Sequence, residues 1–320
     1  MRAFFVVLFL AIGWGHTAAA GPILDRVKAE GVVHCGSAER PGLATVAGDQ
    51  WRGLNVDVCR AVAAAVLGSP DRIEFHEYET PKQYDGVRLG TDDLFFLTAG
   101  EINEQELAGK VLPGPTVFVE THNVMVPRDS KIRHLKDLAG QTICFMLRTS
   151  AEHSLRGYLG NRPWIAMGYS EDGEMMDAYN VHRCGAVAYE ITTLLPLLGQ
   201  KGALGFANRI LPEPLVAFPV MATTGTDDGA WSAIVAWTVH TLVSGERPET
   251  HWYYGGARAM PVAAPELGLD NGWQARVLSA VGHYGQIYER HLGKRSGLVL
   301  ARGLNANQVE GGLLLSPFLE

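Results

Sequence analysis

The sequence has no excess of basic residues. Its 320 residues include 27 Lys and Arg against 34 Asp and Glu, which gives a formal net charge of -7. Nucleic acids and anionic membrane surfaces attract clusters of positive charge. The composition therefore weighs against both as partners, and we expect no nucleic acid to bind.

Beyond the first twenty residues the sequence has no long apolar run. Residues 1–20 combine a charged start at Arg2, the apolar stretch AFFVVLFLAI and small residues up to Ala20, which is typical of a cleaved export signal. This stretch is shorter than the roughly 20 residues that a membrane-spanning helix needs. We expect cleavage near Ala20, no lipid anchor because no Cys lies beside that site, and a soluble exported protein.

Motifs of catalysis and metal binding are also missing. The sequence contains no CxxC or HxxxH spacing, no nucleophile elbow, no phosphate loop and no persuasive Ser/His/Asp set. The histidines are scattered, and we expect them to be structural or surface residues: His34, His76, His122, His153, His182 and His240. We therefore expect a protein without a metal or cofactor that is not an enzyme.

Only four cysteines are present, at positions 35, 59, 144 and 184. An oxidising compartment outside the cytoplasm lets cysteines pair, and four cysteines allow three connectivities. The simplest connectivity joins Cys35 to Cys59 and Cys144 to Cys184, so that each bond links one region internally. Four unpaired buried thiols are the alternative.

The stretch at 51–67, WRGLNVDVCRAVAAAVL, organises the chain. Its apolar residues recur at helical spacing and predict a helix with one buried face: Val58, Ala61, Val62, Ala65 and Val66. We expect Asn55 to cap this helix, Asp57 to favour its first turn through the helix dipole, and Gly68 to end it.

Other segments alternate between strand and helix patterns. A helix at 23–30, a strand-prone run at 32–36, a strand at 73–79 and a helix from Thr80 and Pro81 to Gly90 come first. This alternation predicts a mainly parallel sheet with crossover helices.

Two extended runs, 117–126 and 215–223, are long for ordinary strands and are expected to cross between two lobes. Between them, a strand candidate at 137–147 precedes a helix at 149–159 with Thr149 and Glu152 as a capping box, and a buried strand at 183–190 follows. After them we expect a helix capped by Asp227 or Asp228 and a continuous helix over 273–292.

Five stretches together resemble the periplasmic solute-binding proteins of amino-acid ABC transporters, in the polar and general L-amino-acid-binding branch of solute-binding protein family 3. They are GVVHCGSAERPGL, WRGLNVDVCRAVAAAVLGSP, MDAYNVHRCGAV, LGLDNGWQARVLSAVGHYGQIYERHLG and ARGLNANQVEGGLLLSPF. The four cysteines sit where that branch carries two disulfides.

The resemblance implies an α/β protein with the type II periplasmic-binding-protein fold. In it, two lobes, each a mainly parallel sheet flanked by helices, are joined by two crossing strands and close on a ligand by a hinge. We expect a signal peptide at 1–20, lobe 1 at 21–120, lobe 2 at 121–217, and a return to lobe 1 with C-terminal helices at 218–320.

The function implied by the resemblance is capture of a small polar solute, an amino acid or a derivative, in the periplasm. The solute is then delivered to an inner-membrane ABC permease, and the binding protein is expected to be a monomer. Two alternatives remain open. One is a periplasmic enzyme similar to dehydratases of prephenate-like substrates, with Glu190 or Glu101 as general acid; the other is a diverged receptor that binds a partner protein.

The ligand site implied by the resemblance departs from the family's pattern. In lobe 1, Leu97, followed by Thr98, stands where the family has an Arg that holds the ligand carboxylate. In lobe 2, Thr149 and Ser150 preserve a helix start that faces the carboxylate, Arg148 replaces a Gly, and Glu190 replaces the amine-binding Asp. We hypothesise that Arg148 supplies the lost guanidinium; a solvent-facing loop Arg is the alternative.

Overall fold

The computed structural model describes residues 21–78, 85–98, 111–199, 205–246 and 265–317. The expected signal peptide, the helix start at Thr80 and Pro81, and Glu101 lie outside these ranges. Within these ranges, no helix combines the length and apolar character needed to cross a membrane.

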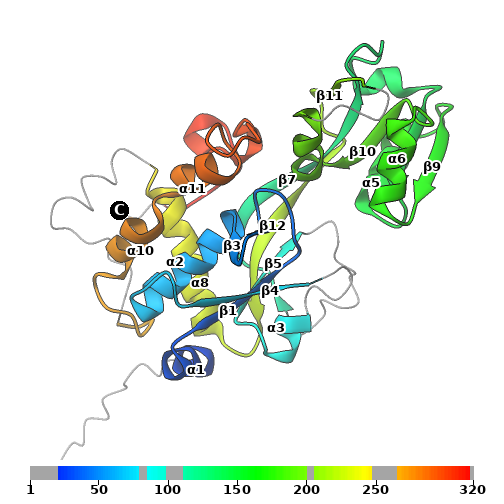
Figure 1. Ribbon diagram of the computed structural model, residues 1–320. Helices are drawn as coiled ribbons and strands as arrows, with labels where there is room; N and C mark the ends of the chain where they lie inside the picture. Colours follow the sequence, from blue (N-terminus) through cyan, green and yellow to red (C-terminus); the bar gives the residue numbers. More distant parts are fainter. Residues whose placement is uncertain (1–20, 79–84, 99–110, 200–204, 247–264, 318–320) are drawn as a thin grey trace, which may run out of the picture.

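One sheet continues through both ends of the molecule (Figure 1), with the strand order β4-β1-β5-β12-β7-β10-β8-β9. Strands β4, β1 and β5 are parallel, as are β10, β8 and β9, whereas the pairs β5–β12, β12–β7 and β7–β10 are antiparallel. We call the β4-β1-β5 end lobe 1 and the β10-β8-β9 end lobe 2. The main strands are β1 (Val33–Ser37), β4 (Ile73–Glu77), β5 (Leu94–Thr98), β7 (Thr116–Pro127), β8 (Thr142–Met146), β9 (Ile165–Tyr169), β10 (Ala186–Glu190) and β12 (Val216–Gly225).

Four short strands complete the set within the described residues. Strand β6 (Val111–Leu112) pairs with β12, β11 (Asn208–Ile210) pairs with β7, and β2 (Thr45–Ala47) forms a separate hairpin with β3 (Gln50–Arg52).

The two expected crossing strands are β7 and β12. β12 pairs with β5 of lobe 1 through Val220–Thr223, while β7 pairs with β10 of lobe 2 through His122–Met125. Between these ends the two strands pair with each other. The predicted α/β fold, two mainly parallel lobes joined by two long strands, is therefore confirmed.

Each lobe has its own apolar core. The main core of lobe 1 uses residues up to Phe118 and from Val220 onward, whereas both clusters of lobe 2 use residues between Val124 and Leu211. Figure 1 shows α2, α8, α10 and α11 gathered in lobe 1 and α5 and α6 in lobe 2.

Within the described residues, the helices of lobe 1 are α1 (Pro22–Glu30), α2 (Leu54–Leu67), α3 (Asp85–Leu89), α8 (Gly229–Ser244), α10 (Trp273–Val281) and α11 (Tyr284–His291). Those of lobe 2 are α5 (Ser150–Leu159), α6 (Asp172–Asn180) and α7 (Ile191–Leu194). Short 3-10 segments are η2 (Leu135–Leu138), η3 (Leu195–Gly199), η4 (Gly303–Asn305) and η5 (Gln308–Glu310).

Helix α2 differs from its prediction in two respects. It is buried nearly all round rather than on one face, because α8, α10 and α11 pack against it in addition to the sheet. Its N-cap is Gly53, not Asn55, which lies inside the first turn and donates to Ser37 Oγ at 3.1 Å. Gly53 has φ 142°, and a Cβ there would lie 2.1 Å from the Leu43 carbonyl oxygen, so the close approach of these two segments requires glycine.

Asp57 lies in the first turn of α2 and also makes a tertiary contact. Its carboxylate accepts hydrogen bonds from Arg60 at 2.9 Å, from His291 Nε2 at 2.7 Å and from Arg290. Burial alone would raise the pKa of Asp57, but the contacts of His291 and the two arginines hold it below its ordinary value. This carboxylate therefore ties α2 to α11.

The expected continuous helix over 273–292 is wrong. It is divided into α10 and α11 at Gly282, whose φ of 85° is incompatible with a continuing right-handed helix. Two predicted caps are confirmed: Asp228 accepts from the Trp231 N–H at 2.9 Å, and Thr149 is the N-cap of α5.

Both disulfides form as in the simplest pairing. Cys35–Cys59 joins β1 to α2. Cys144–Cys184 joins β8 to the short segment just before β10. Each bond links a strand to a segment packed beside it in one lobe.

Replacing both members of one pair with Ala should destabilise the protein by about 3 to 4 kcal/mol, because the bonds close loops with sequence separations of 24 and 40 residues. Urea unfolding of Cys35→Ala/Cys59→Ala and of Cys144→Ala/Cys184→Ala measures both effects. A Cys59–Cys144 peptide in a non-reducing map of the wild-type protein would contradict the pairing.

Candidate functional site

Polar and charged side chains gather where β7 passes from lobe 1 to lobe 2. Arg40 follows the carboxyl end of β1, the Ser150 helix start follows β8, and Glu190 ends β10. Loops at the carboxyl ends of parallel strands are the usual place for ligand sites in α/β proteins. The hinge cluster comprises Arg40, Glu120, His122, Ser150, Glu190 and Thr192.

An ion pair connects the two lobes in this cluster. Arg40 Nη1 lies 3.2 Å from Glu190 Oε1, and the two side chains are only 13% and 10% exposed. The other oxygen, Glu190 Oε2, is buried and has no hydrogen-bond partner within the described part of the chain. Glu190 can therefore accept a further donor without breaking an existing hydrogen bond at that oxygen.

Glu120 is a second carboxylate, fully buried on β7. It accepts hydrogen bonds from Thr192 Oγ1 at 2.7 Å, from the Thr192 N–H at 3.4 Å and from the Thr121 N–H at 3.2 Å. Burial raises the pKa of Glu120 to about 7; Arg40 opposes this shift and the charge of Glu190 adds to it. The cluster therefore contains a carboxyl group that titrates near neutral pH.

His122 lies opposite Glu190 in the β7–β10 pairing. Its Nε2 is 3.8 Å from Glu190 Oε1 and 3.4 Å from the Ser150 hydroxyl, and its ring meets Phe218 at 5.3 Å. Burial lowers the pKa of His122, which outweighs the opposing effect of Glu190. The imidazole is therefore neutral at pH 7, and its Nδ1 has no hydrogen-bond partner among residues that the structure describes.

Three of the predicted lobe 2 residues, Arg148, Thr149 and Ser150, lie around the start of α5, whereas Glu190 ends β10. Ser150 reaches the hinge cluster, whereas the Thr149 hydroxyl donates to the Met146 carbonyl at 2.7 Å. The expected capping box of Thr149 and Glu152 is wrong: the Thr149 side chain makes no cap hydrogen bond, and Glu152 Oε2 accepts from the Arg148 N–H at 2.9 Å instead.

Arg148 itself is exposed and has φ 61°, a left-handed conformation that favours glycine. Its guanidinium makes no hydrogen bond or ion pair with the residues of the described ranges.

The predicted lobe 1 residues lie apart from this cluster. Leu97 is fully buried on β5 and packs with Val87 and Phe95. Thr98 is also buried, and it pairs with Val220 of β12. Since β12 and β7 separate β5 from β10, these two residues are not brought together with Glu190.

Sequence reasoning missed Arg40, Glu120 and His122. Arg40 lies three positions after the parallel strand β1, where a ligand contact is expected. Glu120 and His122 are polar residues two apart in an apolar run, and period-two spacing places them on one face of a strand.

The sequence of the chain is similar to those of known binding proteins. The chain is 29% identical to the general L-amino acid-binding periplasmic protein AapJ of Rhizobium johnstonii, over 95% of this chain and 94% of that protein. It is also 29% identical to the glutamate/glutamine/aspartate/asparagine-binding protein BztA of Rhodobacter capsulatus, over 94% of each. No protein-family model matches the chain.

A solved structure resembles the fold as well. It is an ABC transporter/periplasmic binding protein from Brucella ovis with glutathione bound, with a TM-score of 0.78 and 25% identity, covering 94% of this chain and 100% of that one. The homologues are thus periplasmic binding proteins of amino-acid transport rather than enzymes, and the resemblance found in the sequence is confirmed.

Glu120→Gln should remove a pH dependence of stability. Since the pKa of Glu120 is about 7 in the folded protein and ordinarily 4.5, the unfolded chain loses this proton first as pH rises. The free energy of unfolding should therefore fall between pH 4.5 and 7, by up to about 3 kcal/mol, and be independent of this group above that range. Gln keeps an acceptor for Thr192 and cannot ionise, so the variant should be more stable than the wild type at pH 8.

Urea unfolding at several pH values measures this difference. The control is Glu213→Gln in lobe 2, which removes a half-buried carboxylate bound to His134 and should leave the decline in place. An unchanged decline in Glu120→Gln would show that Glu120 is ionised when folded.

Proposed function

We propose that this chain is the periplasmic substrate-binding component of an ABC transporter. It captures an amino acid or a small derivative between its lobes and delivers it to an inner-membrane permease, making and breaking no covalent bond. The observation that carries this proposal is the similarity to AapJ and BztA, which spans at least 94% of the chain in both cases.

The hinge cluster provides the ligand contacts in this proposal. An α-amino acid carries one ammonium and one carboxylate. Glu190 and Arg40, which meet from opposite lobes, have the complementary charges. The ammonium binds the unpaired Oε2 of Glu190, and the carboxylate binds Arg40 and the first N–H groups of α5 beside Ser150. A zwitterion therefore replaces the ion pair without leaving a buried charge unpaired.

Arg148 provides a second guanidinium at the start of α5. Its side chain is exposed, and none of the contacts described for the chain holds it in place, so it can turn toward a ligand carboxylate when the lobes close. This arrangement compensates for Leu97, which is packed into the core of lobe 1 and offers no charge. Recognition of the carboxylate thus moves from β5 to loops that follow β1 and β8.

These contacts favour a solute with a free amino-acid head group. Standard L-amino acids have it, and so does glutathione, whose γ-glutamyl end keeps its α-amino and α-carboxylate groups. The Brucella ovis protein was solved with glutathione. Larger derivatives of this kind therefore belong in the same test as the amino acids.

The proposed mechanism of capture is bending of β7 and β12. The lobe division expected from the sequence, 21–120, 121–217 and 218–320, has its boundaries in or beside these strands. We also propose that the mature protein starts after Ala20 and is a monomer, which N-terminal sequencing and light scattering of the exported protein would test.

The purified protein should release its natural solute on denaturation, and mass spectrometry should identify it. Screening the L-amino acids and glutathione by thermal shift gives a second readout, because a ligand at one hundred times its Kd stabilises the folded state by about 2.7 kcal/mol. Absence of a bound solute together with no shift from any compound would contradict the proposed function.

Glu190→Gln and Arg40→Ala should each weaken binding of the identified amino-acid solute about 10- to 100-fold, since the first removes the negative charge that faces the ligand ammonium and the second removes the guanidinium that binds its carboxylate. Arg148→Ala should have an effect of similar size. Isothermal titration calorimetry measures all three affinities.

The matched control is Arg133→Ala. Arg133 is exposed and follows β7, which is antiparallel to β10, so it lies at the opposite edge of the lobe 2 sheet. The Arg133→Ala variant should bind the solute with the affinity of the wild type. Full affinity in Arg148→Ala would remove Arg148 from the site, and full affinity in Glu190→Gln would move the ligand away from the hinge cluster.

A further inference from the structure

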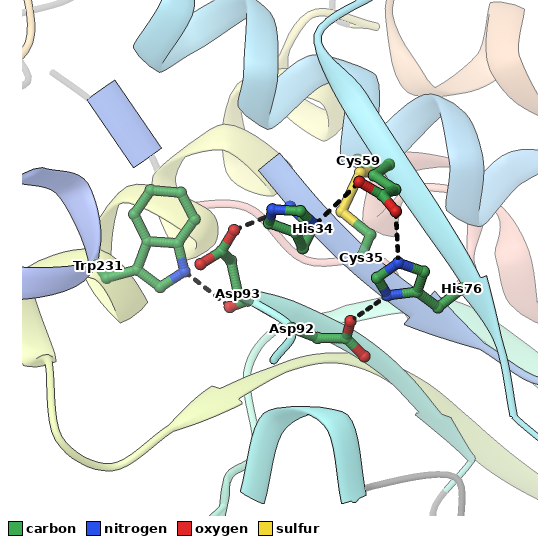
Figure 2. The surroundings of a disulfide bond; sticks show 8 residues. His34, Cys35, Cys59, His76, Asp92, Asp93 and Trp231 are labelled. Carbon is green, nitrogen blue, oxygen red and sulfur yellow. Dashed lines mark hydrogen bonds and ion pairs between the residues drawn. A yellow bond between two sulfur atoms is a disulfide. The ribbon is translucent and has the colours of Figure 1, made fainter. Parts of the chain in front are cut away.

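A second cluster lies at the outer edge of the lobe 1 sheet, beside the Cys35–Cys59 disulfide (Figure 2). β1 and β4 are parallel, and their register places His34 next to Glu74 and Gly36 next to His76. Because side chains alternate along a strand, His34, Glu74 and His76 project from the same face. The neighbouring Cys35 and Phe75 point to the other face, into the main core.

The three side chains are close enough to share one ion. One ligand atom from each lies within 4.8 Å of the other two. His76 Nε2 is 3.2 Å from Glu74 Oε1, and His34 Nδ1 is 3.6 Å from Glu74 Oε2. Ligand atoms around a tetrahedral zinc ion are about 3.3 Å apart, given zinc–ligand bonds of 2.0 to 2.2 Å.

Each imidazole also has a carboxylate at its other nitrogen. His76 Nδ1 lies 2.6 Å from Asp92 Oδ1, and His34 Nε2 lies 3.5 Å from Glu30 Oε2. Figure 2 shows Asp92 on one side of the His76 ring. In metal sites such outer carboxylates hold the proton on one ring nitrogen and direct the lone pair of the other toward the metal.

Two further observations point to a cation. His34 Nδ1 is buried and has no hydrogen-bond partner within the part of the chain that the structure describes. The carboxylates of Glu30, Glu74 and Asp92 surround the two imidazoles, while the neighbouring Arg26 is paired with Asp93 at 2.5 Å. A divalent ion would use that nitrogen and offset the negative charge.

We propose that His34 Nδ1, His76 Nε2 and the Glu74 carboxylate bind a zinc ion, with water as the fourth ligand. Two imidazoles and one carboxylate form a donor set that suits zinc. The Glu74 side chain is 61% exposed, which leaves the ion a path from solvent. The ion joins strand β4 to β1 and is independent of the hinge cluster, since Arg40 follows the opposite end of β1.

The test uses the disulfide-bonded protein without a histidine tag, stripped of metal by a chelator. Zinc titration should show one ion bound per chain and a higher melting temperature that the chelator reverses. Cobalt in place of zinc should give the visible absorption of a four-coordinate site. The double variant His34→Gln/His76→Gln should lose zinc binding, and Asp92→Asn should weaken it at least tenfold, because loss of such an outer partner costs 10- to 100-fold.

His134→Gln is the matched control, because His134 is an exposed histidine 2.6 Å from a carboxylate, Glu213, but it belongs to no such three-residue group in the described ranges. It should bind zinc as the wild type does. A measurement without variants is available in the imidazole NMR signals: zinc should shift those of His34 and His76 and leave that of His134 unchanged. No binding by the wild type, or full binding by the double variant, would overturn the proposal.

Discussion

The antiparallel pairing of β7 with β12 is the constraint on which the rest of the structure depends. Each strand is long enough to pair with its partner and with a parallel strand of one lobe, β12 with β5 and β7 with β10. The lobe 1 core ends within this pairing, at the partners Phe118 and Val220, and the lobe 2 core begins at Val124, beyond the last β7–β12 pair at His122. Two separately packed lobes can therefore move relative to each other while the chain between them stays hydrogen-bonded.

The same pairing brings charge into the centre of the molecule. Glu120 and His122 occupy the segment of β7 that belongs to neither core, and Arg40 and Glu190 approach it from opposite lobes. Unlike charges are attracted more strongly where water is excluded, and the raised pKa of Glu120 reflects the cost of an additional buried carboxylate. A zwitterionic solute suits this environment because its two charges meet both members of the pair. The lobe 1 edge carries a separate polar cluster, in which His34 and His76 face Glu74.

Much of the fold could be predicted from local patterns. The caps Asp228 and Thr149, the two long strands, the alternation of strands and helices and the pairing of four exported cysteines follow from backbone preferences and compartment chemistry. The candidate site was only half predictable. Ser150 and Glu190 followed from the resemblance, but Arg40, Glu120 and His122 did not, because their contacts join strands far apart in the chain.

By itself, the sequence determined the α/β class and the crossing strands, since both depend on residue type and short-range spacing. It favoured the observed disulfide pairing only as the simplest of three, and the expected arginine at Leu97 came from the resemblance. Tertiary structure decided where side chains from separate elements meet. The nearly complete burial of α2 depends on α8, α10 and α11. The Arg40–Glu190 pair depends on the approach of two lobes, and the His34–Glu74–His76 group depends on the register of β1 against β4. A search for histidines at helical spacing could not find that last group, because one of its members comes from a different strand.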